Sequence, residues 1–241
     1  MPVMSVKRID VPGGAILFED TLARDMSNEK FSVEYYLSAG RMIGSAGGRG
    51  TVSFVRGDNG EWAIRHYQRG GFIGRWLHDH FWWAGETRAR SFAEWMLLRE
   101  LRARRLPVPI PVAARFLRHG LAYTADLITV RIPGASPLSE RLAQGRVADK
   151  DWHTVGSGVR RFHEEGVYHA DLTGHNILVD ESGSMHLLDF DRGRIRAPGA
   201  WRQANLARLE RSLRKISATT DGVQVTDANW QSLLKGYDSL G

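Results

Sequence analysis

The chain has 241 residues, 42% of them apolar, no cysteine and a formal net charge of +6. This composition is sufficient for a folded core, and the missing cysteines exclude disulfide bonds, thiolate zinc sites and a cysteine nucleophile. No run of about 18 apolar residues and no secretory signal is seen, so we expect a cytoplasmic protein whose basic excess favours anionic partners or is simply solvated.

The first part of the chain is predicted to form a hairpin followed by a helix. Residues 51–55 and 61–67 are rich in strand formers and flank the turn at 57–60. Apolar residues recur at helical spacing over 91–105, and this segment stops before the extended, proline-rich stretch 107–111. The expected order is therefore strand, turn, strand and helix.

The second part is predicted to be mainly helical. A strand over 121–132 ends at Pro133-Gly134, which is a plausible hinge. Helices are expected over 152–165, with Gly166 as its stop, and over 201–216, the last helix that the pattern indicates. We therefore expect a strand-rich part of about 1–130 and a helix-rich part of about 131–241.

A second predicted hairpin would bring two metal-binding side chains together. The runs 177–180 and 185–188 flank a tight turn at 181–184. If the runs pair as antiparallel strands, Asn176 and Asp189 lie at the same open end. An amide oxygen and a carboxylate are hard ligands suited to Mg²⁺, so we expect these two residues to bind the metal.

The segment before this hairpin supplies the candidate base. Asp171 lies five residues before Asn176, where a carboxylate can accept a proton from an acceptor hydroxyl that attacks a γ-phosphate. His169 is a second candidate for the catalytic machinery. We expect it to brace the loop by hydrogen bonding, with proton transfer as the alternative.

These residues resemble the protein-kinase-like superfamily, whose catalytic loop reads H-R-D-L-x-x-x-x-N and whose second metal ligand is the Asp of D-F-G. Four residues occur at the positions that this pattern requires: His169, Asp171, Asn176 and Asp189. Ala170 replaces the arginine, Thr173 takes the position of the catalytic-loop lysine, and Asp191 replaces the final glycine. Regulation by phosphorylation of an activation loop is therefore not expected.

The resemblance extends to the first predicted hairpin. Gly47, Gly48 and Gly50 match the latter half of the glycine-rich loop that covers ATP phosphates, although glycine clusters are more often simple turns. Trp62-Ala63-Ile64-Arg65 matches V-A-I-K, with arginine in place of lysine. Glu94 is then the expected partner of Arg65, the alternative being an ordinary exposed carboxylate.

The superfamily implies an α+β fold in one domain. Its N-lobe, about 1–130, would be an antiparallel β-sheet plus one helix. Its C-lobe, about 131–241, would be mostly helical and carry the catalytic β-hairpin.

Three further segments narrow the family. They read R-H-Y-Q-R-G-G at 65–71, H-A-D-L at 169–172 and L-L-D-F-D-R at 187–192, and only 52 residues follow Asp189, without A-P-E. The chain resembles the bacterial lipopolysaccharide core kinases that act on 3-deoxy-D-manno-octulosonic acid (Kdo). This resemblance implies transfer of phosphate from ATP, with Mg²⁺, to the 4-hydroxyl of Kdo in a Kdo-lipid A precursor.

Such an enzyme would work as a peripheral protein at the cytoplasmic face of the bacterial inner membrane. Residues 70–90 mix aromatic and basic side chains, which suits an anionic membrane surface or, equally, a cap on the core of the first lobe. Arg192, Arg194 and Arg196 are candidates for binding an anionic acceptor, or solvated loop charges.

The nearest alternative function is another small-molecule kinase, such as a heptose kinase or an aminoglycoside phosphotransferase, since these share the H-x-D-x-x-x-x-N and D-x-D patterns. An inactive nucleotide-binding protein or a basic nucleic-acid-binding protein is also conceivable. Neither of these last two needs Asp171, Asn176 and Asp189 together. We therefore expect no nucleic-acid partner.

Overall fold

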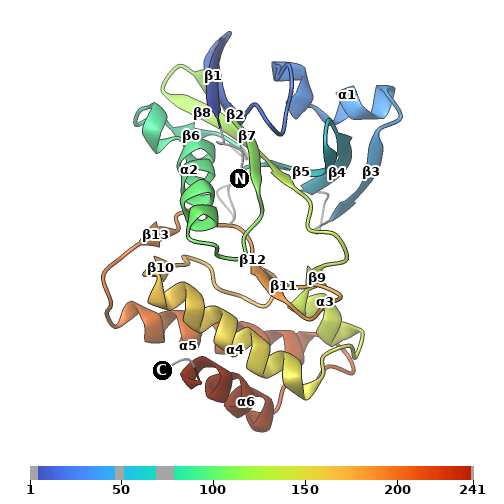
Figure 1. Ribbon diagram of the computed structural model, residues 1–241, viewed down its shortest axis with the longest axis vertical. Coiled ribbons are helices and arrows are strands. Elements are labelled where there is room, and N and C mark those ends of the chain that lie inside the picture. Colours follow the sequence, from blue (N-terminus) through green and yellow to red (C-terminus); the bar gives the residue numbers. More distant parts are fainter. Residues whose placement is uncertain (1–4, 47–51, 69–78, 240–241) are drawn as a thin grey trace. The chain divides into compact units, whose positions relative to one another are not determined.

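The computed structural model describes residues 5–46, 52–68 and 79–239, and the chain is α+β as predicted (Figure 1). The chain divides into two compact units. Unit 1 comprises Met1–Arg99 with Ile110–Arg131, and unit 2 comprises Glu100–Pro109 with Ile132–Gly241.

Unit 1 is built on an antiparallel sheet, as the sequence predicted. Its strands follow the order β1-β2-β7-β8-β5-β4-β3, and β6 pairs with β8 outside this path. The strands are β1 (Val6–Val11), β2 (Gly14–Glu19), β3 (Met42–Ala46), β4 (Val52–Gly57), β5 (Gly60–His66), β6 (Phe81–Trp82), β7 (Pro111–His119) and β8 (Ala122–Val130). The predicted hairpin is confirmed by the pairing of β4 with β5, and the predicted strand at 121–132 is β8.

Two α-helices begin among the described residues of unit 1, one more than expected. They are α1 (Val33–Ser38) and α2 (Arg90–Ala103), accompanied by the 3-10 helices η1 (Asn28–Phe31) and η3 (Glu86–Arg88). The α2 helix (Figure 1) is the one predicted at 91–105. Its Phe92 packs against Phe116 of β7 with ring centroids 5.0 Å apart. The strands β1, β2, β3, β6 and β7 and the short α1 were not predicted.

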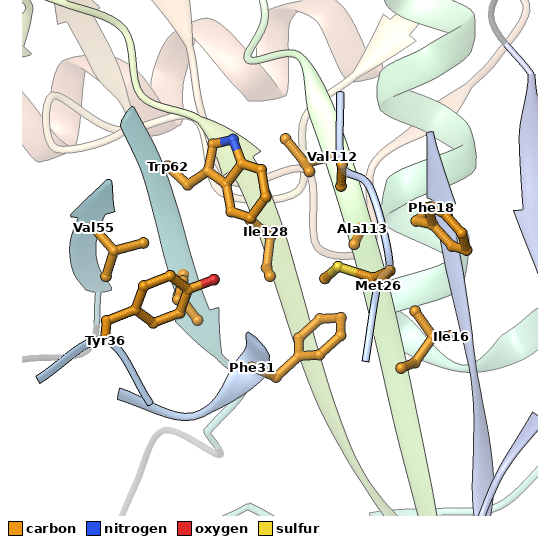
Figure 2. Packing of buried hydrophobic residues seen from close by; sticks show 12 residues of the cluster. Ile16, Phe18, Met26, Phe31, Tyr36, Val55, Trp62, Val112, Ala113 and Ile128 are labelled. Carbon is orange, nitrogen blue, oxygen red and sulfur yellow. The ribbon is translucent and has the colours of Figure 1, made fainter. Parts of the chain in front are cut away.

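Strand periodicity explains how β5 serves both the core and the candidate site. Trp62 and Ile64 are buried in the core of unit 1, where they join Ile128, Phe31 and the other side chains of Figure 2. Burial of each large apolar side chain contributes roughly 1.5–3 kcal/mol. Because successive side chains of a strand alternate between its faces, Arg65 projects on the face opposite Trp62 and Ile64.

Unit 2 contains four α-helices and short strand pairs among its described residues. The helices are α3 (Leu138–Ala143), α4 (Asp149–Glu164), α5 (Trp201–Thr219) and α6 (Asp227–Asp238), and the strands are β9 (Ser136–Pro137), β10 (Val167–Tyr168), β11 (Ile177–Val179), β12 (Met185–Leu187) and β13 (Arg194–Ile195). The helices predicted at 152–165 and 201–216 are α4 and α5, each slightly longer than expected. None of the described helices has both the length and the apolar character needed to cross a bilayer.

The α6 helix corrects the expectation that α5 would be the last. It packs beside α4 (Figure 1), and two glycines permit this close approach. A Cβ atom on Gly156 would lie 1.9 Å from the carbonyl oxygen of Leu233, and one on Gly236 would lie 2.1 Å from that of His153. Glycine has a low helix propensity, but here it allows the backbones of α4 and α6 to pack closely together.

Candidate active site

The predicted hairpin of unit 2 is present and has the expected register. Ile177 of β11 pairs with Leu187 of β12, and the next backbone bond runs from the amide of Leu188 to the carbonyl of Asn176, 2.8 Å. Asn176 therefore lies just before β11 and Asp189 just after β12, at the same open end of the hairpin. This arrangement results from local strand propensity and a short turn.

Asp180 organises that turn. Its Oδ1 accepts hydrogen bonds from the backbone amides of Ser182 and Ser184, 2.9 Å each, and its Oδ2 lies 2.8 Å from Nε2 of His186. Partial burial acts to raise the pKa of Asp180, but the hydrogen bonds from Ser182, His186 and Ser184 outweigh it and lower the pKa to about 2. The ionised carboxylate therefore holds the hairpin together.

We expect Asp180→Ala to lower the free energy of unfolding by about 2 kcal/mol at neutral pH. Because folding lowers the pKa of this carboxyl from 3.8 to about 2, its stabilisation is complete above about pH 4 and is lost as the pH falls toward 2. Urea denaturation of both proteins at several pH values measures the difference. A difference that stays constant from pH 7 to 3 would contradict this assignment, and Glu181→Ala, in the same turn, is the control.

His169 is buried and held between two backbone groups. Its Nε2 donates to the carbonyl of Leu188, 2.8 Å, and its Nδ1 accepts from the amide of Asp171, 3.1 Å. Burial lowers the pKa of His169 and keeps the ring neutral. Both ring nitrogens are thus engaged in joining the His169–Asn176 loop to the end of β12, which is the geometry of a brace.

Asp171 is exposed and lies between two donors. Its Oδ1 is 3.2 Å from Nη1 of Arg208, and its side chain is 56% exposed. Nδ2 of Asn176 donates to the backbone oxygen of Asp171, 2.8 Å, and lies 3.4 Å from its Oδ2. The structure therefore brings Asp171 and Asn176 together, and an exposed carboxylate remains accessible to an acceptor hydroxyl.

The polar face of α5 holds the His169–Asn176 loop, which the sequence reasoning missed. Asn205 accepts from the amide of His169, 3.3 Å, and donates to its carbonyl, 2.9 Å. Ser212 accepts from the amide of Gly174, 3.2 Å, and Arg208 binds Asp171. The spacing 205, 208 and 212 places all three residues on one helical face. This shared face can be read from the sequence, but the loop that it contacts cannot.

Asp189 has a left-handed backbone conformation, with φ of 60°, at the end of β12. Its Oδ1 lies 3.4 Å from the amide of Asp191. Asp189 and Asp171 both line a cavity of about 380 Å³, called here the Asp171 cavity. The other residues of its wall are Tyr168, Ala170, Asp191, Arg192, Arg194 and Arg208.

The donor set at this end of the hairpin fits Mg²⁺. Since the amide nitrogen of Asn176 faces Asp171, its oxygen is the atom left to ligate a metal, and Asp189 supplies a carboxylate. Among the described residues no group of three His, Asp or Glu side chains is arranged to hold an ion. Two protein oxygens are nevertheless what Mg²⁺ typically uses when phosphate and water complete its shell.

Arg65 and Glu94 meet within unit 1. Arg65 of β5 forms an ion pair with Glu94 of α2, whose side chain is only 2% exposed. The hydroxyl of Tyr67 donates to Oε2 of Glu94, 2.6 Å, and the Arg65 guanidinium lies 4.5 Å from the centroid of the Tyr67 ring. Glu94 is therefore a buried, ion-paired carboxylate. Gly47, Gly48 and Gly50 lie outside the described residues.

His66, which lies between Arg65 and Tyr67 in the sequence, belongs to a separate hydrogen-bond network. Its Nδ1 lies 2.7 Å from Oδ1 of the buried Asp126, which Arg115 also binds at 2.8 Å. The hydrogen bond to Asp126 raises the pKa of His66. All three residues of the segment Arg65-His66-Tyr67 thus fix polar groups in unit 1.

The aromatic segment at 70–90 is described only from residue 79 onward. Phe81 is buried, and Trp83 packs against Phe116 with ring centroids 4.8 Å apart. Trp82 between them is 73% exposed. Phe81 is therefore buried in unit 1, Trp83 is half-buried against Phe116, and Trp82 presents its ring to the surroundings.

Comparison with known proteins gives consistent matches. A model of the lipopolysaccharide kinase (Kdo/WaaP) family matches residues 34–237. A 3-deoxy-D-manno-octulosonic acid kinase of Stenotrophomonas maltophilia (strain K279a) is 43% identical over 227 residues, which cover 93% of this chain and 90% of that protein. Proteins of the same name from Xylella fastidiosa (strain M23) and Vibrio cholerae serotype O1 are 41% and 38% identical, over 93% and 83% of this chain and 90% and 85% of their own lengths.

Proposed function

The chain belongs to the lipopolysaccharide kinase (Kdo/WaaP) family, and from this we propose that it transfers the γ-phosphate of ATP to the 4-hydroxyl of Kdo in a Kdo-lipid A precursor. The family match confirms the resemblance that the motifs indicated. The observation that carries the proposal is the convergence of Asp171, Asn176 and Asp189 around one hairpin end. The two units correspond in this proposal to the lobes of a protein-kinase-like fold.

In the proposed reaction Asp171 acts as the base. Its carboxylate accepts the proton of the sugar hydroxyl while that oxygen attacks the γ-phosphorus. The bond from the γ-phosphorus to the bridging oxygen breaks, and ADP leaves. Arg208 and Asn176 position Asp171, and His169 braces the loop without taking part in proton transfer.

Asn176 and Asp189 are proposed to hold Mg²⁺, which would neutralise charge on the phosphate oxygens. The Arg65 guanidinium, fixed by Glu94, is the proposed ligand of the ATP phosphates in unit 1. The planar fork of arginine suits phosphate oxygens, which accounts for its presence where protein kinases have lysine.

Arg192 and Arg194 are the proposed partners of the Kdo carboxylate. Both line the Asp171 cavity, as the proposed base does. An arginine fork binds a carboxylate through two parallel hydrogen bonds, which orients as well as attracts it. Arg196, the third arginine of this connection, instead lies 5.1 Å from the centroid of the Tyr168 ring.

The direct test is incubation with ATP, Mg²⁺ and a Kdo-lipid A precursor, followed by the mass of the product. We expect the glycolipid to gain one phosphate, and fragmentation to place that phosphate on the 4-hydroxyl of Kdo. Parallel reactions with heptose-bearing acceptors and with an aminoglycoside separate the related kinase functions. Phosphorylation of one of those acceptors alone would refute the proposal.

A lipid-linked acceptor suggests that the protein works as a peripheral protein at the inner face of the bacterial inner membrane. Trp82 supports this, because an exposed tryptophan favours the headgroup region. Leu121 is also exposed, and its carbonyl accepts the amide of Trp83, so it lies next to this segment. The two side chains together form the proposed apolar contact.

We expect Trp82→Ala to weaken binding to vesicles of anionic lipid by several-fold, since it removes interfacial area without opening the core. Vesicle flotation at several lipid concentrations measures the effect. Leu37→Ala, which removes an apolar side chain that is 58% exposed elsewhere in unit 1, is the matched control. Equal binding by wild type and Trp82→Ala would remove this residue from the membrane contact.

A further inference from the structure

A second cavity of unit 2 is lined by other residues of the His169–Asn176 loop and has no place in the proposed reaction. It has a volume of about 570 Å³ and is called here the α5 cavity. Thr173 and His175 contribute to its wall, whereas Asp171 and Asp189 line the Asp171 cavity. Arg208 lines both cavities, so they are neighbours at this residue.

The wall of the α5 cavity is basic. Arg208, Arg211 and Lys215 all line it, and their spacing of three and four residues places them on one face of α5. Glu140 is the one carboxylate among its described lining residues, and it accepts a hydrogen bond from Gln144, 3.1 Å. Because Arg208 is paired with Asp171, two further cations face one carboxylate, and the cavity keeps a positive charge.

Two of these cations, Arg211 and Lys215, form no ion pair with another described residue and so do not stabilise the fold in that way. Within the described parts of the chain, neither Arg211 nor Lys215 has a carboxylate within ion-pair distance. Arg214, on another face of the same helix, pairs with both Glu210 and Asp227. Exposed like charges at such spacing weaken a helix slightly, so a bound anion would offset an unfavourable arrangement.

We propose that the α5 cavity binds a phosphate group of the glycolipid acceptor, remote from the hydroxyl that is phosphorylated. This inference rests on the proposed function. The sugar carboxylate would bind Arg192 and Arg194 in the Asp171 cavity, and the phosphate would bind Arg211 and Lys215 in the α5 cavity. Arginine and lysine are the usual phosphate ligands, and a concave wall suits a discrete group better than a flat bilayer.

The test is a double variant, Arg211→Ala with Lys215→Ala, assayed with two acceptors in detergent. One is the Kdo-lipid A precursor with its phosphates intact, and the other is the same glycolipid after enzymatic dephosphorylation. We expect the variant to raise KM for the intact acceptor at least about tenfold, since two charge-assisted contacts are lost. KM for ATP, kcat and KM for the dephosphorylated acceptor should match those of the wild type.

A charge-matched control is available in the same unit. Lys150→Ala with Lys235→Ala removes two exposed cations that lie outside both cavities. This control should behave as wild type with both acceptors. An unchanged KM in the test variant, or an equal loss with both acceptors, would overturn the phosphate assignment.

Two further measurements separate the remaining explanations. Equilibrium binding of the two acceptors without ATP tests the cavity even if the wild type transfers no phosphate, so the two proposals fail independently. Binding to phosphatidylglycerol vesicles that lack acceptor tests a lipid headgroup as the source of the anion. Loss of vesicle binding in the variant, with normal affinity for the dispersed acceptor, would assign the cavity to the bilayer and refute our proposal.

Discussion

Asp171→Asn is expected to lower kcat by about 10²–10⁴-fold, the usual contribution of a general base. The amide keeps the size of the side chain and an oxygen for Arg208, but it cannot take the proton of the acceptor hydroxyl. Because the side chain is 56% exposed, the free energy of unfolding should change by less than about 1 kcal/mol. Steady-state kinetics with ATP and the Kdo acceptor, beside urea denaturation, measure both quantities.

Asp227→Asn is the matched control for this variant. Asp227 is also an exposed aspartate paired with an arginine of α5, Arg214, but it lies outside the Asp171 cavity. It should retain the wild-type kcat. If Asp171→Asn kept more than a tenth of the activity with its fold intact, another group would have to be the base.

Asp189→Asn is expected to lower kcat about 10³-fold, equivalent to roughly 4 kcal/mol of transition-state stabilisation. The substitution removes the charge of a proposed Mg²⁺ ligand. Asparagine tolerates the left-handed conformation that Asp189 adopts, with φ of 60°, so the backbone is preserved. The Mg²⁺ concentration for half-maximal activity should rise in parallel, which a titration of the initial rate with Mg²⁺ measures.

Asp25→Asn is the matched control for Asp189→Asn, because it makes the same change at another aspartate with a left-handed backbone conformation. Asp25 is an exposed aspartate with φ of 48°, in unit 1, so the same change occurs in a similar conformation away from the hairpin. Its kinetics and Mg²⁺ dependence should be those of the wild type. An Asp189→Asn protein with normal Mg²⁺ dependence would show that the carboxylate is not a metal ligand.

The predicted elements that the structure confirms depend on short-range patterns. The β4–β5 hairpin follows from strand formers on either side of Asp58-Asn59, and the β11–β12 hairpin follows in the same way from the turn after Asp180. Gly166 ends α4 as expected, with φ of 73°. Each of these signals lies within a few residues of the structure that it specifies, so no tertiary information is needed.

One missed element, the α6 helix, depends on a long-range contact. The α6 helix does carry local signals, since Thr226 caps it and Trp230, Leu233 and Tyr237 share one face. Glycine is a poor helix former, and only the backbone of α4 shows why one is needed at Gly236. Helix propensity was outweighed by packing, as often happens where two helices approach closely.

Sequence by itself determined the chemistry of the candidate residues and their placement at one hairpin end, because hairpin register is a local property that fixes Asn176 and Asp189 together. Tertiary structure alone decided which groups support Asp171 and His169. Asn205, Arg208 and Ser212 reach the loop from more than thirty residues away, across a helix–loop contact that no local pattern encodes. It also placed Arg211 and Lys215 in a cavity, because side chains that share a helical face acquire a function only from what packs opposite them.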